Sequence, residues 1–210
     1  SMFVSTVSHD LKTPLTSIKI FAEMLLQNEK SLSDRSKNHL EIIEGETDRL
    51  TRLINNVLDF SKIERGIKDY SFREIHLNQI IKNVIERMQY TLKMKGFVLK
   101  TDLNEFNDLI NGDADAIIEA VENIISNAVR FSNDQKEITI TTYFQNGFAY
   151  VEITDKGIGI GQTDFENIFN PFFRSEDAKL KKIEGTGLGL PIVKHIMDEH
   201  KGKREIKSKL

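Results

Sequence analysis

The chain has 210 residues, enough for one large domain or for a small element joined to a medium one. Hydrophobic residues make up 39% and charged residues 29%, a mixture that excludes a disordered chain and supports a sizeable core. The formal net charge of −3 argues against nucleic-acid binding through a broad basic surface. The sequence contains no cysteine, which excludes disulfides, thiolate catalysis and cysteine-ligated zinc. Its longest apolar run has four residues, so no segment is expected to enter a membrane.

The first 64 residues have the apolar spacing of two long helices. In the first, an apolar residue recurs every seven positions, which is the heptad seam of a coiled coil, at Val4, Leu11, Ile18 and Leu25, with Val7 and Phe21 between them. A polar break over residues 27–33 precedes the second helix, expected from Asp34 to about Glu64. The two helices should form an antiparallel hairpin.

A two-helix hairpin of about 60 residues cannot bury both of its apolar faces alone. We expect it to pair with a second copy of the chain as a four-helix bundle. The alternative is a single hairpin that packs on its own C-terminal domain.

Beyond Gly66 the pattern changes to alternating helices and strands. Asn146-Gly147 is typical of a type I′ hairpin turn between two strands. Because the regular short period of a parallel sheet is absent, we expect an α/β sandwich with mixed strands. Helices are expected at 77–95 and from an N-cap at Asp113 to about 131, and strands at 97–102, 138–143 and 149–154.

One histidine of the first helix stands apart from the heptad seam. At about 100° per residue, His9 lies about 160–200° from Val7 and Leu11, so it faces outward. Pro14 lacks an N–H group, and we expect it to bend the helix one turn after the histidine. A proline within a heptad series breaks a local rule, as functional sites often do, although a plain surface histidine is the alternative.

Residues 3–15, with the sequence FVSTVSHDLKTPL, resemble the phosphoacceptor motif of sensor histidine kinases. The resemblance implies that His9 is the nucleophile that accepts phosphate, that Asp10 orients and deprotonates the imidazole, and that Thr13 assists the reverse phosphatase reaction. The chemistry agrees, because a neutral imidazole is a competent nucleophile at pH 7. Asp10 departs from the family, which more often has glutamate at that position.

A polar stripe lies on the helix that follows Asp113. Asn123, Asn127 and Arg130 are spaced i, i+4 and i+7, so they share one face. One interpretation is a solvated polar face. The other is a site for Mg²⁺ and phosphate, whose oxygens and charges would satisfy all three side chains.

Residues 122–132, with the sequence ENIISNAVRFS, resemble the asparagine motif of the same kinases. By this resemblance Asn127 supplies the Mg²⁺ ligand and Asn123 assists it. Arg130 stands where lysine is usual and Phe131 where tyrosine is usual, which keeps the charge and the aromatic packing but loses a hydroxyl group.

Two glycine-rich segments follow. The first, DKGIGI at 155–160, combines a carboxylate at Asp155 that can accept the adenine amino group with glycines that bring the backbone close to a ligand. The second, GTGLGL at 185–190, precedes Pro191 at the first turn of a helix, so that backbone N–H groups point at phosphate. Neither segment fits a dinucleotide fingerprint or a P-loop.

Together with IFNPFFR at 168–174, these segments match in order the two glycine motifs and the phenylalanine motif of the ATP-binding domain of these kinases. Residues 162–184 would then form a mobile lid that excludes water, with Arg174 placed for the γ-phosphate. The resemblance implies that the nucleotide contacts residues of both glycine motifs, namely Asp155, Gly157, Gly159, Ile160, Gly185, Thr186, Gly187, Leu188 and Gly189.

The resemblance covers nearly the whole chain through five ordered motifs. It implies a homodimeric helical hairpin for dimerisation and histidine phosphotransfer at residues 1–65, and an α/β sandwich of the Bergerat or GHKL ATP-binding type at 66–210. It also implies ATP and Mg²⁺ as cofactors, autophosphorylation of His9, and phosphotransfer to an aspartate of a response-regulator receiver domain. Since His9 and the ATP site then lie on different units, the peptide at residues 63–70 must hinge.

Both ends of the sequence look cut. Ser1 before Met2 resembles a cloning remnant, so we expect this stretch to be the cytoplasmic part of a longer, membrane-bound bacterial sensor. Residues 204–210 should begin a strand, and the final strand of the family would be missing. The other histidines are interpreted as surface or packing residues, namely His39, His76, His195 and His200.

Two other functions stay open. One is an ATP-hydrolysing clamp related to type II topoisomerases and MutL, which activate water with a glutamate where this chain has Asn123, an amide that cannot act as a base. The other is a non-catalytic dimerisation scaffold, against which the intact motif residues argue. Rapid ATP turnover without phosphohistidine would favour the clamp, and failure to bind ATP with Mg²⁺ would favour the scaffold.

Overall fold

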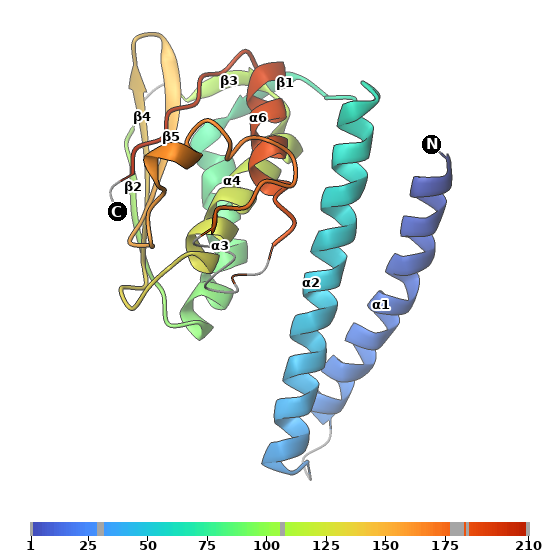
Figure 1. Cartoon of the computed structure of the whole chain (residues 1–210). Helices are drawn as coiled ribbons and strands as arrows, with labels where there is room; N and C mark the ends of the chain where they lie inside the picture. The colour runs from blue at the N-terminus through green and yellow to red at the C-terminus, as the bar shows by residue number, and fades with distance from the viewer. Residues whose placement is uncertain (1, 29–31, 106–107, 177–182, 184, 209–210) are drawn as a thin grey trace. The chain divides into compact units, whose positions relative to one another are not determined.

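The chain divides into two compact units, Ser1–Lys68 and Asp69–Leu210. The structure is a computed structural model that describes residues 2–28, 32–105, 108–176, 183 and 185–208, without the side chains of residues 2–10 and 28. The first unit is a helical hairpin and the second a mixed α/β unit, which confirms the predicted fold class (Figure 1).

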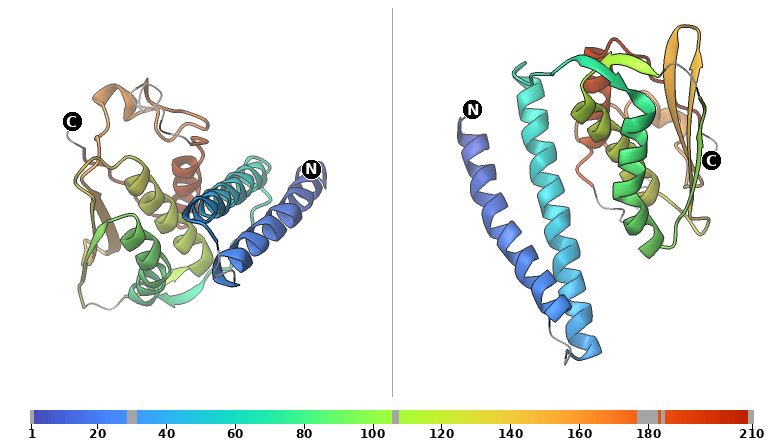
Figure 2. Two further views of the ribbon diagram at one scale, coloured as in Figure 1. Left: turned by 90° about the horizontal axis from the view of Figure 1, so that it is seen from below. Right: turned by 180° about the vertical axis from the view of Figure 1, so that it is seen from behind.

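The hairpin consists of two long helices, α1 (Met2–Asn28) and α2 (Asp34–Glu64). α2 begins where the sequence predicts, because the Ser33 hydroxyl accepts a 3.1 Å hydrogen bond from the backbone N–H of Ser36. The helices run antiparallel, lie close together at the end where they are joined, and diverge toward the N-terminus of α1 (Figures 1 and 2).

α1 continues through Pro14 without ending. In the following turn the hydroxyl groups of Thr16 and Ser17 donate to the carbonyl oxygens of Lys12 and Thr13, at 2.9 and 3.2 Å. Serine and threonine hydroxyls that bond back to the i−4 carbonyl tend to bend a helix. The turn after Pro14 therefore combines two influences that favour a bend.

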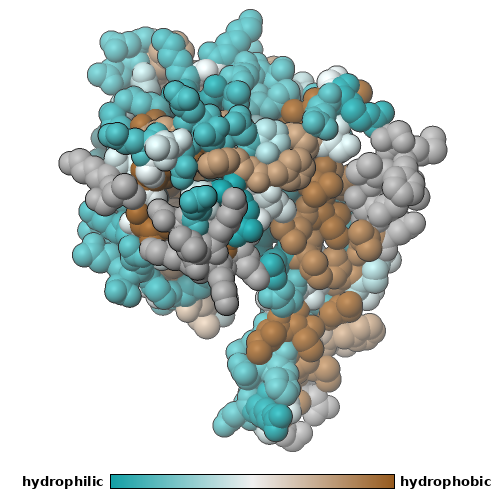
Figure 3. Space-filling model, in the orientation of Figure 1, coloured by the Kyte–Doolittle hydropathy of each residue, from teal (hydrophilic) through white to brown (hydrophobic). Residues whose placement is uncertain are grey.

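Much of the predicted apolar seam stays exposed in the single chain. Figure 3 shows apolar side chains gathered along the hairpin. The heptad spacing is kept on both helices, so each presents an unburied apolar stripe. The side chains of Val4 and Val7 lie outside the described residues. The stripe residues are between 41% and 48% exposed, and they are Leu11, Ile18 and Leu25 on α1 and Ile43, Leu50 and Val57 on α2.

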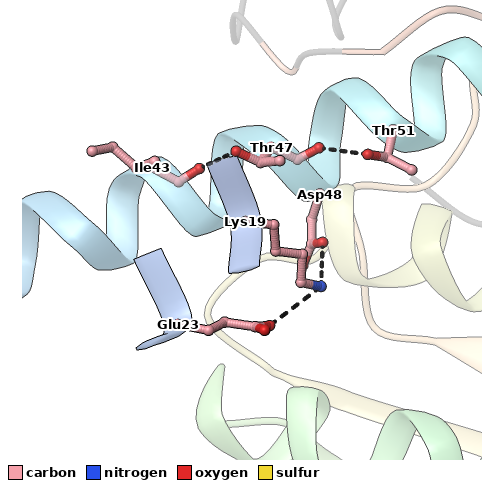
Figure 4. A network of polar contacts seen from close by, with 6 residues as sticks. All are labelled: Lys19, Glu23, Ile43, Thr47, Asp48 and Thr51. Carbon is pink, nitrogen blue, oxygen red and sulfur yellow. Dashed lines mark hydrogen bonds and ion pairs between the residues drawn. The ribbon is translucent and has the colours of Figure 1, made fainter. Parts of the chain in front are cut away.

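The two helices approach each other at small side chains. Ala22 of α1 and Thr47 of α2 are 3% and 4% exposed. The Thr47 hydroxyl donates to the carbonyl oxygen of Ile43 at 2.7 Å, so its burial leaves no donor unsatisfied. Lys19 Nζ lies 2.7 Å from Asp48, a cross-helix ion pair (Figure 4), and this hydrogen bond raises the pKa of Lys19 above its ordinary value.

The second unit contains two sheets in the described part of the chain. One is three-stranded with the order β2-β4-β5, in which β2 pairs parallel and β5 antiparallel to β4, and the other is the antiparallel pair β1-β3. The mixed sheet agrees with the sequence prediction. The elements are β1 (Arg73–His76), α3 (Leu77–Met94), β2 (Val98–Leu103), β3 (Leu109–Gly112), α4 (Ala114–Arg130), β4 (Glu137–Gln145), β5 (Phe148–Asp155), a 3₁₀ turn (Gln162–Asp164) and α6 (Gly189–Glu199).

The helices α3, α4 and α6 lie on one side of the three-stranded sheet (Figures 1 and 2). The core between the layers has fully buried side chains from each, among them Ile81 and Val84 of α3, Ile125 of α4, and Ile138 and Ile140 of β4. Burial of one face of α4 fixes the rotation of this helix about its axis, and therefore the direction of its polar stripe.

The β4–β5 hairpin has the predicted turn. Asn146 and Gly147 both have positive φ, 52° and 82°, as a type I′ turn requires. Side chains alternate along β4, so that Thr142 is buried against the helices and Tyr143 lies on the opposite face. There the ring of Tyr143 stacks on Tyr150 of β5, with ring centroids 4.9 Å apart.

Two details differ from the sequence prediction. The pair β1-β3 was not expected, because strands of four residues are too short for an alternating pattern to stand out. No strand forms over residues 204–208, which were expected to begin one. In this segment the Ser208 hydroxyl, rather than a backbone group, accepts a 2.8 Å hydrogen bond from the N–H of Ile160.

Candidate functional site

α4 carries the polar stripe that the sequence predicts. Its start is fixed by Asp113, whose Oδ1 accepts a 2.9 Å hydrogen bond from the N–H of Ala116. Asn123 Nδ2 donates to the carbonyl oxygen of Glu119 at 3.0 Å, so the amide oxygen of Asn123 is turned away from the helix backbone. The three stripe residues, Asn123, Asn127 and Arg130, extend over two turns, and Arg130 Nη1 donates to Asn127 Oδ1 at 3.4 Å.

The second glycine motif lies directly against this stripe. A Cβ atom added at Gly185 would lie 3.0 Å from Arg130 Nη1, and one at Gly189 would lie 3.0 Å from Asn123 Oδ1 and 3.8 Å from Asn127 Nδ2. The glycines therefore leave the space beside the polar groups open. The α4 stripe and the second glycine motif, which are far apart in the sequence, thus meet where α6 begins. The first backbone N–H groups of a helix have no partner within the helix, so those of α6 are available to a ligand at this place.

Gly187 sits at the tightest point of this loop. Its φ is +71°, and its carbonyl oxygen accepts a 3.1 Å hydrogen bond from the N–H of Phe172, which itself has a φ of 64°. The phenylalanine motif and the second glycine motif are therefore joined through their backbones. The sequence gives no spacing signal for this contact.

Replacing Gly187 with alanine is expected to lower nucleotide affinity at least about tenfold. A Cβ at this position would lie 2.6 Å from the carbonyl oxygen of Phe173, and alanine at this positive φ is strained by about 1–2 kcal/mol. The loop must then shift relative to Phe172 and Phe173, which moves the second glycine motif from its place beside the α4 stripe. Titration with a fluorescent ATP analogue measures the loss.

Gly161→Ala is the matched control for this substitution. Gly161 has a φ of −65°, and the nearest atom to an added Cβ is 3.9 Å away. Equal affinities of both variants and the parent chain would contradict a role of the Gly187 loop in nucleotide binding.

The first glycine motif contacts the C-terminal end of α4 through its backbone. Asp155 Oδ1 accepts a 2.7 Å hydrogen bond from the N–H of Gly157, and the side chain of Asp155 is exposed. The N–H of Ile158 donates to the carbonyl oxygen of Phe131 at 3.0 Å, and Ser132 forms a bridge with Gly157. A Cβ at Gly157 would lie 2.7 Å from that same carbonyl oxygen, so only glycine fits this approach.

The remaining predicted nucleotide residues lie in loops of the same unit. Gly159 has a positive φ of 74°, and the Thr186 hydroxyl accepts a 3.3 Å hydrogen bond from the N–H of Leu188, which is fully buried. Ile160 is half-buried, and the Arg174 guanidinium donates to the carbonyl oxygen of Ile183. Of the expected lid, residues 177–182 and 184 lie outside the described part of the chain.

The phosphoacceptor residues belong to the first unit. The backbone of His9 and Asp10 is part of α1, while their side chains lie outside the described residues. Thr13, one turn further along α1, is exposed. The structure therefore places all candidate nucleotide residues in the second unit, with the α4 stripe beside Gly185 and Gly189, and places His9, Asp10 and Thr13 on the hairpin.

The residues of the second unit fit a nucleotide phosphate chain with a divalent cation. The amide groups of Asn123 and Asn127 offer oxygen ligands of the kind that Mg²⁺ prefers, and Arg130 offers guanidinium donors for phosphate. Among the described residues, no group of three or more histidine, aspartate and glutamate side chains could hold a metal ion.

Two family models match the chain. The phospho-acceptor domain of His Kinase A matches residues 1–66, and the histidine kinase-, DNA gyrase B- and HSP90-like ATPase matches residues 112–210. No helix in the described residues has the length and apolar character needed to cross a bilayer.

Curated relatives match across the two units. The uncharacterised sensor-like histidine kinase ycf26 of Pyropia yezoensis is 36% identical over all of this chain and 34% of its own length. The sensor histidine kinase WalK of Bacillus subtilis is 33% identical over 95% of this chain and 33% of its own length. The chain thus spans about a third of the length of these relatives.

A solved structure shares the fold. The crystal structure of full-length ShkA in complex with AMPPNP aligns with a TM-score of 0.68 at 22% identity, over 94% of this chain and 40% of its own. The two family models match successive parts of the chain, the family's motifs occur in their usual order, and these relatives are sensor histidine kinases. The chain therefore belongs to the sensor histidine kinases of two-component systems.

Proposed function

We propose that the chain is the catalytic part of a kinase that transfers the γ-phosphoryl group of ATP to His9 and then to an aspartate of a response-regulator receiver domain. The observation that carries this proposal is the convergence of the α4 polar stripe on the Gly185–Gly189 loop, in a chain whose first helix carries the phosphoacceptor motif. Residues 1–65 would serve dimerisation and phosphotransfer, and residues 66–210 would bind ATP in the cytoplasm, where ATP and the receiver domain are available.

The nucleotide would be held between the two glycine motifs. Asp155, which is exposed at the end of β5, would accept the adenine amino group, and the N-terminus of α6 would face the phosphates. Arg130 and Arg174 would neutralise phosphate charge. A Mg²⁺ ion bound by the amide oxygen of Asn127, with help from Asn123, would neutralise further negative charge on the phosphates.

Two side chains of the hairpin, His9 and Asp10, would carry out the phosphoryl transfer. One ring nitrogen of His9 attacks the γ-phosphorus, so that an N–P bond forms as the bond to the β,γ-bridging oxygen breaks and ADP leaves. The proton on the other ring nitrogen passes to the Asp10 carboxylate. In the reverse, phosphatase direction, Thr13 would position a water molecule at the receiver phosphoryl group.

The hairpin would form a homodimer. The stripes described above are a pair of apolar seams with heptad spacing, one on each helix, and each is about half exposed in a single chain. Two copies that bring these seams together would bury them in a four-helix bundle.

Leu50→Glu is expected to raise the dimer dissociation constant at least about 100-fold. The dimer would have to bury two additional unpaired carboxylates, at a cost of several kcal/mol in total. Leu50 is 45% exposed in the single chain, so the substitution disturbs little within one hairpin. Sedimentation equilibrium measures the dissociation constant.

Asn38→Glu on the same helix is the matched control for Leu50→Glu. Asn38 is also exposed, and its replacement by glutamate adds the same charge, but position 38 faces about 120° away from Leu50 of the seam. An equal effect of both variants would show that the added charge, and not the seam, governs association.

A labelling experiment tests the proposed activity. The chain is incubated with ATP carrying a γ-phosphate label and with Mg²⁺, and the protein-bound label is then tested for stability. Phosphohistidine is expected, that is, label that is lost in acid and kept in alkali. Rapid release of phosphate without labelled protein would favour the ATPase clamp, and absence of nucleotide binding would favour the scaffold.

A further inference from the structure

The chain that leaves the hairpin stays attached to α2 for four residues after the helix ends. Gly66 has a φ of +62°, its N–H donates to the Ile63 carbonyl at 2.9 Å, and the N–H of Ile67 donates to the Lys62 carbonyl at 3.0 Å. These two bonds form a Schellman motif, which ends a helix in a defined geometry. Lys68 then folds back toward Asp59 of α2, with Nζ 3.8 Å from the carboxylate and both side chains at most 26% exposed.

The next segment, Tyr70–Phe72, is attached to the second unit, and we call it the strap. The N–H of Ser71 donates to Oδ2 of Asp113 at 2.7 Å. The other oxygen of the same carboxylate caps α4 through the N–H of Ala116 at 2.9 Å. One carboxylate therefore holds both the strap and the first turn of α4.

The rings of the strap pack on the C-terminal end of α6. Phe72 and Tyr70 lie against the His200 ring, with centroid distances of 4.8 and 6.0 Å, and Tyr70 also lies 5.9 Å from His195. His200 Nε2 accepts a 2.9 Å hydrogen bond from the N–H of Asp113. Because Nε2 accepts, the 2.8 Å contact of Nδ1 with the Ile196 carbonyl oxygen is a donated bond, which fixes the ring between α6 and the start of α4.

We propose that Asp69, the residue between the Lys68 contact and the strap, is the hinge between the two units, and that Asp113 and His200 are positioning residues that confine the motion to it. The inference rests on the proposed function in one respect, since it assumes that the second unit must reach His9. The hinge is then much shorter than the eight residues 63–70 that the sequence indicates.

Confinement of the hinge has a physical purpose. A short connection gives the nucleotide a high effective concentration at His9. A longer flexible connection would lower this effective concentration and would no longer orient the nucleotide toward the histidine. The strap is anchored at the start of α4 and the end of α6, the two helices that carry the nucleotide site. Motion at Asp69 therefore moves the nucleotide site as one body.

The anchoring carboxylate is in its charged form at neutral pH. Burial alone would raise the pKa of Asp113, but the N–H groups of Ala116 and Ser71 that donate to it outweigh burial and hold its pKa below the ordinary value. The other charged or titratable side chain that acts on it is His200.

Asp113→Asn tests the strap. Asparagine caps a helix about as well as aspartate, so its oxygen can keep the bond to Ala116, but its NH₂ group cannot accept a hydrogen bond from Ser71. Hydrogen exchange by NMR is expected to show protected Ile67 and Ser71 amides and a rapidly exchanging Asp69 amide in the parent chain. In the variant, exchange of Ser71 should rise at least about tenfold with little change at Ala116.

Autophosphorylation kinetics give the second readout. With the strap released, kcat is expected to fall about three- to tenfold while KM for ATP stays the same, because the nucleotide site itself is intact. The matched control is Asp108→Asn, which alters a carboxylate that accepts from the Asn78 N–H at the start of α3 but does not contact the strap. Ser71→Pro is a second variant, which removes the donor without changing the α4 cap.

The outcomes separate the two proposals. An Asp69 amide as protected as Ser71, a Ser71 amide unaffected by Asp113→Asn, or an unchanged kcat in both strap variants would overturn the inference. If the parent chain incorporates no label, the proposed kinase activity fails, but the exchange measurements still decide where the hinge lies.

Discussion

Replacement of His9 with glutamine is expected to abolish acid-labile label on the chain completely while nucleotide affinity stays unchanged. Glutamine keeps a polar side chain of similar length, but its amide is not a nucleophile, so the N–P bond cannot form. His9 lies on α1, in the unit that does not contain the nucleotide residues, which is why binding should persist. Autoradiography after γ-labelling and a separate ATP titration measure the two effects.

His39→Gln is the matched control for this substitution. His39 is an exposed histidine of α2 with no place in the phosphoacceptor motif, so its variant should label like the parent chain. Label that persists in His9→Gln would mean that another residue accepts the phosphoryl group and would overturn the assignment of His9.

Replacement of Asn127 with alanine is expected to reduce labelling at least about 100-fold, mainly through loss of Mg²⁺-dependent nucleotide binding. The substitution removes the amide that accepts from Arg130 at 3.4 Å and lies beside Gly189, so the stripe loses an oxygen ligand and the guanidinium loses its orientation. Calorimetric titration with ATP, with and without Mg²⁺, distinguishes a lost contribution of Mg²⁺ to ATP affinity from a lower affinity for ATP itself.

Asn83→Ala on α3 is the control for Asn127→Ala. Asn83 is also a helical asparagine with a side-chain partner, since its Oδ1 accepts from Gln79 Nε2 at 3.0 Å. Equal losses in both variants would point to general destabilisation of the unit, and unchanged labelling in Asn127→Ala would remove Asn127 from the site.

The elements that could be predicted are those defined by local chemistry. The N-cap at Asp113, the turn at Asn146-Gly147 and the heptad spacing of the hairpin each depend on residues within a few positions of one another. Such signals need no knowledge of what packs against them, and the structure has all three.

The elements that could not be predicted depend on residues far apart in the chain. Strands β1 and β3 have four residues each and are stabilised by one another. The strap depends on Ser71, which is 42 residues from Asp113, while His200 is 87 residues from Asp113. His200 was interpreted as a surface or packing histidine, and nothing in its neighbouring sequence indicates two specific hydrogen bonds.

The candidate nucleotide site was predictable as a set of residues but not as an arrangement. The motifs identify Arg130 and Gly185 separately, and only the fold brings them within contact distance. The backbone bond between Phe172 and Gly187 belongs to the same class, because residues with positive φ other than glycine have no reliable sequence signal.

The tyrosines, two of which stack on the β4–β5 hairpin, lie in the second unit, and this distribution has a spectroscopic consequence. The chain has no tryptophan, and its four tyrosines, at positions 70, 90, 143 and 150, all follow Lys68, the last residue of the first unit. Intrinsic tyrosine fluorescence therefore reports on the second unit alone, whereas far-ultraviolet circular dichroism also contains the signal of the two long helices. A difference between the two melting curves measures directly how independently the two units unfold.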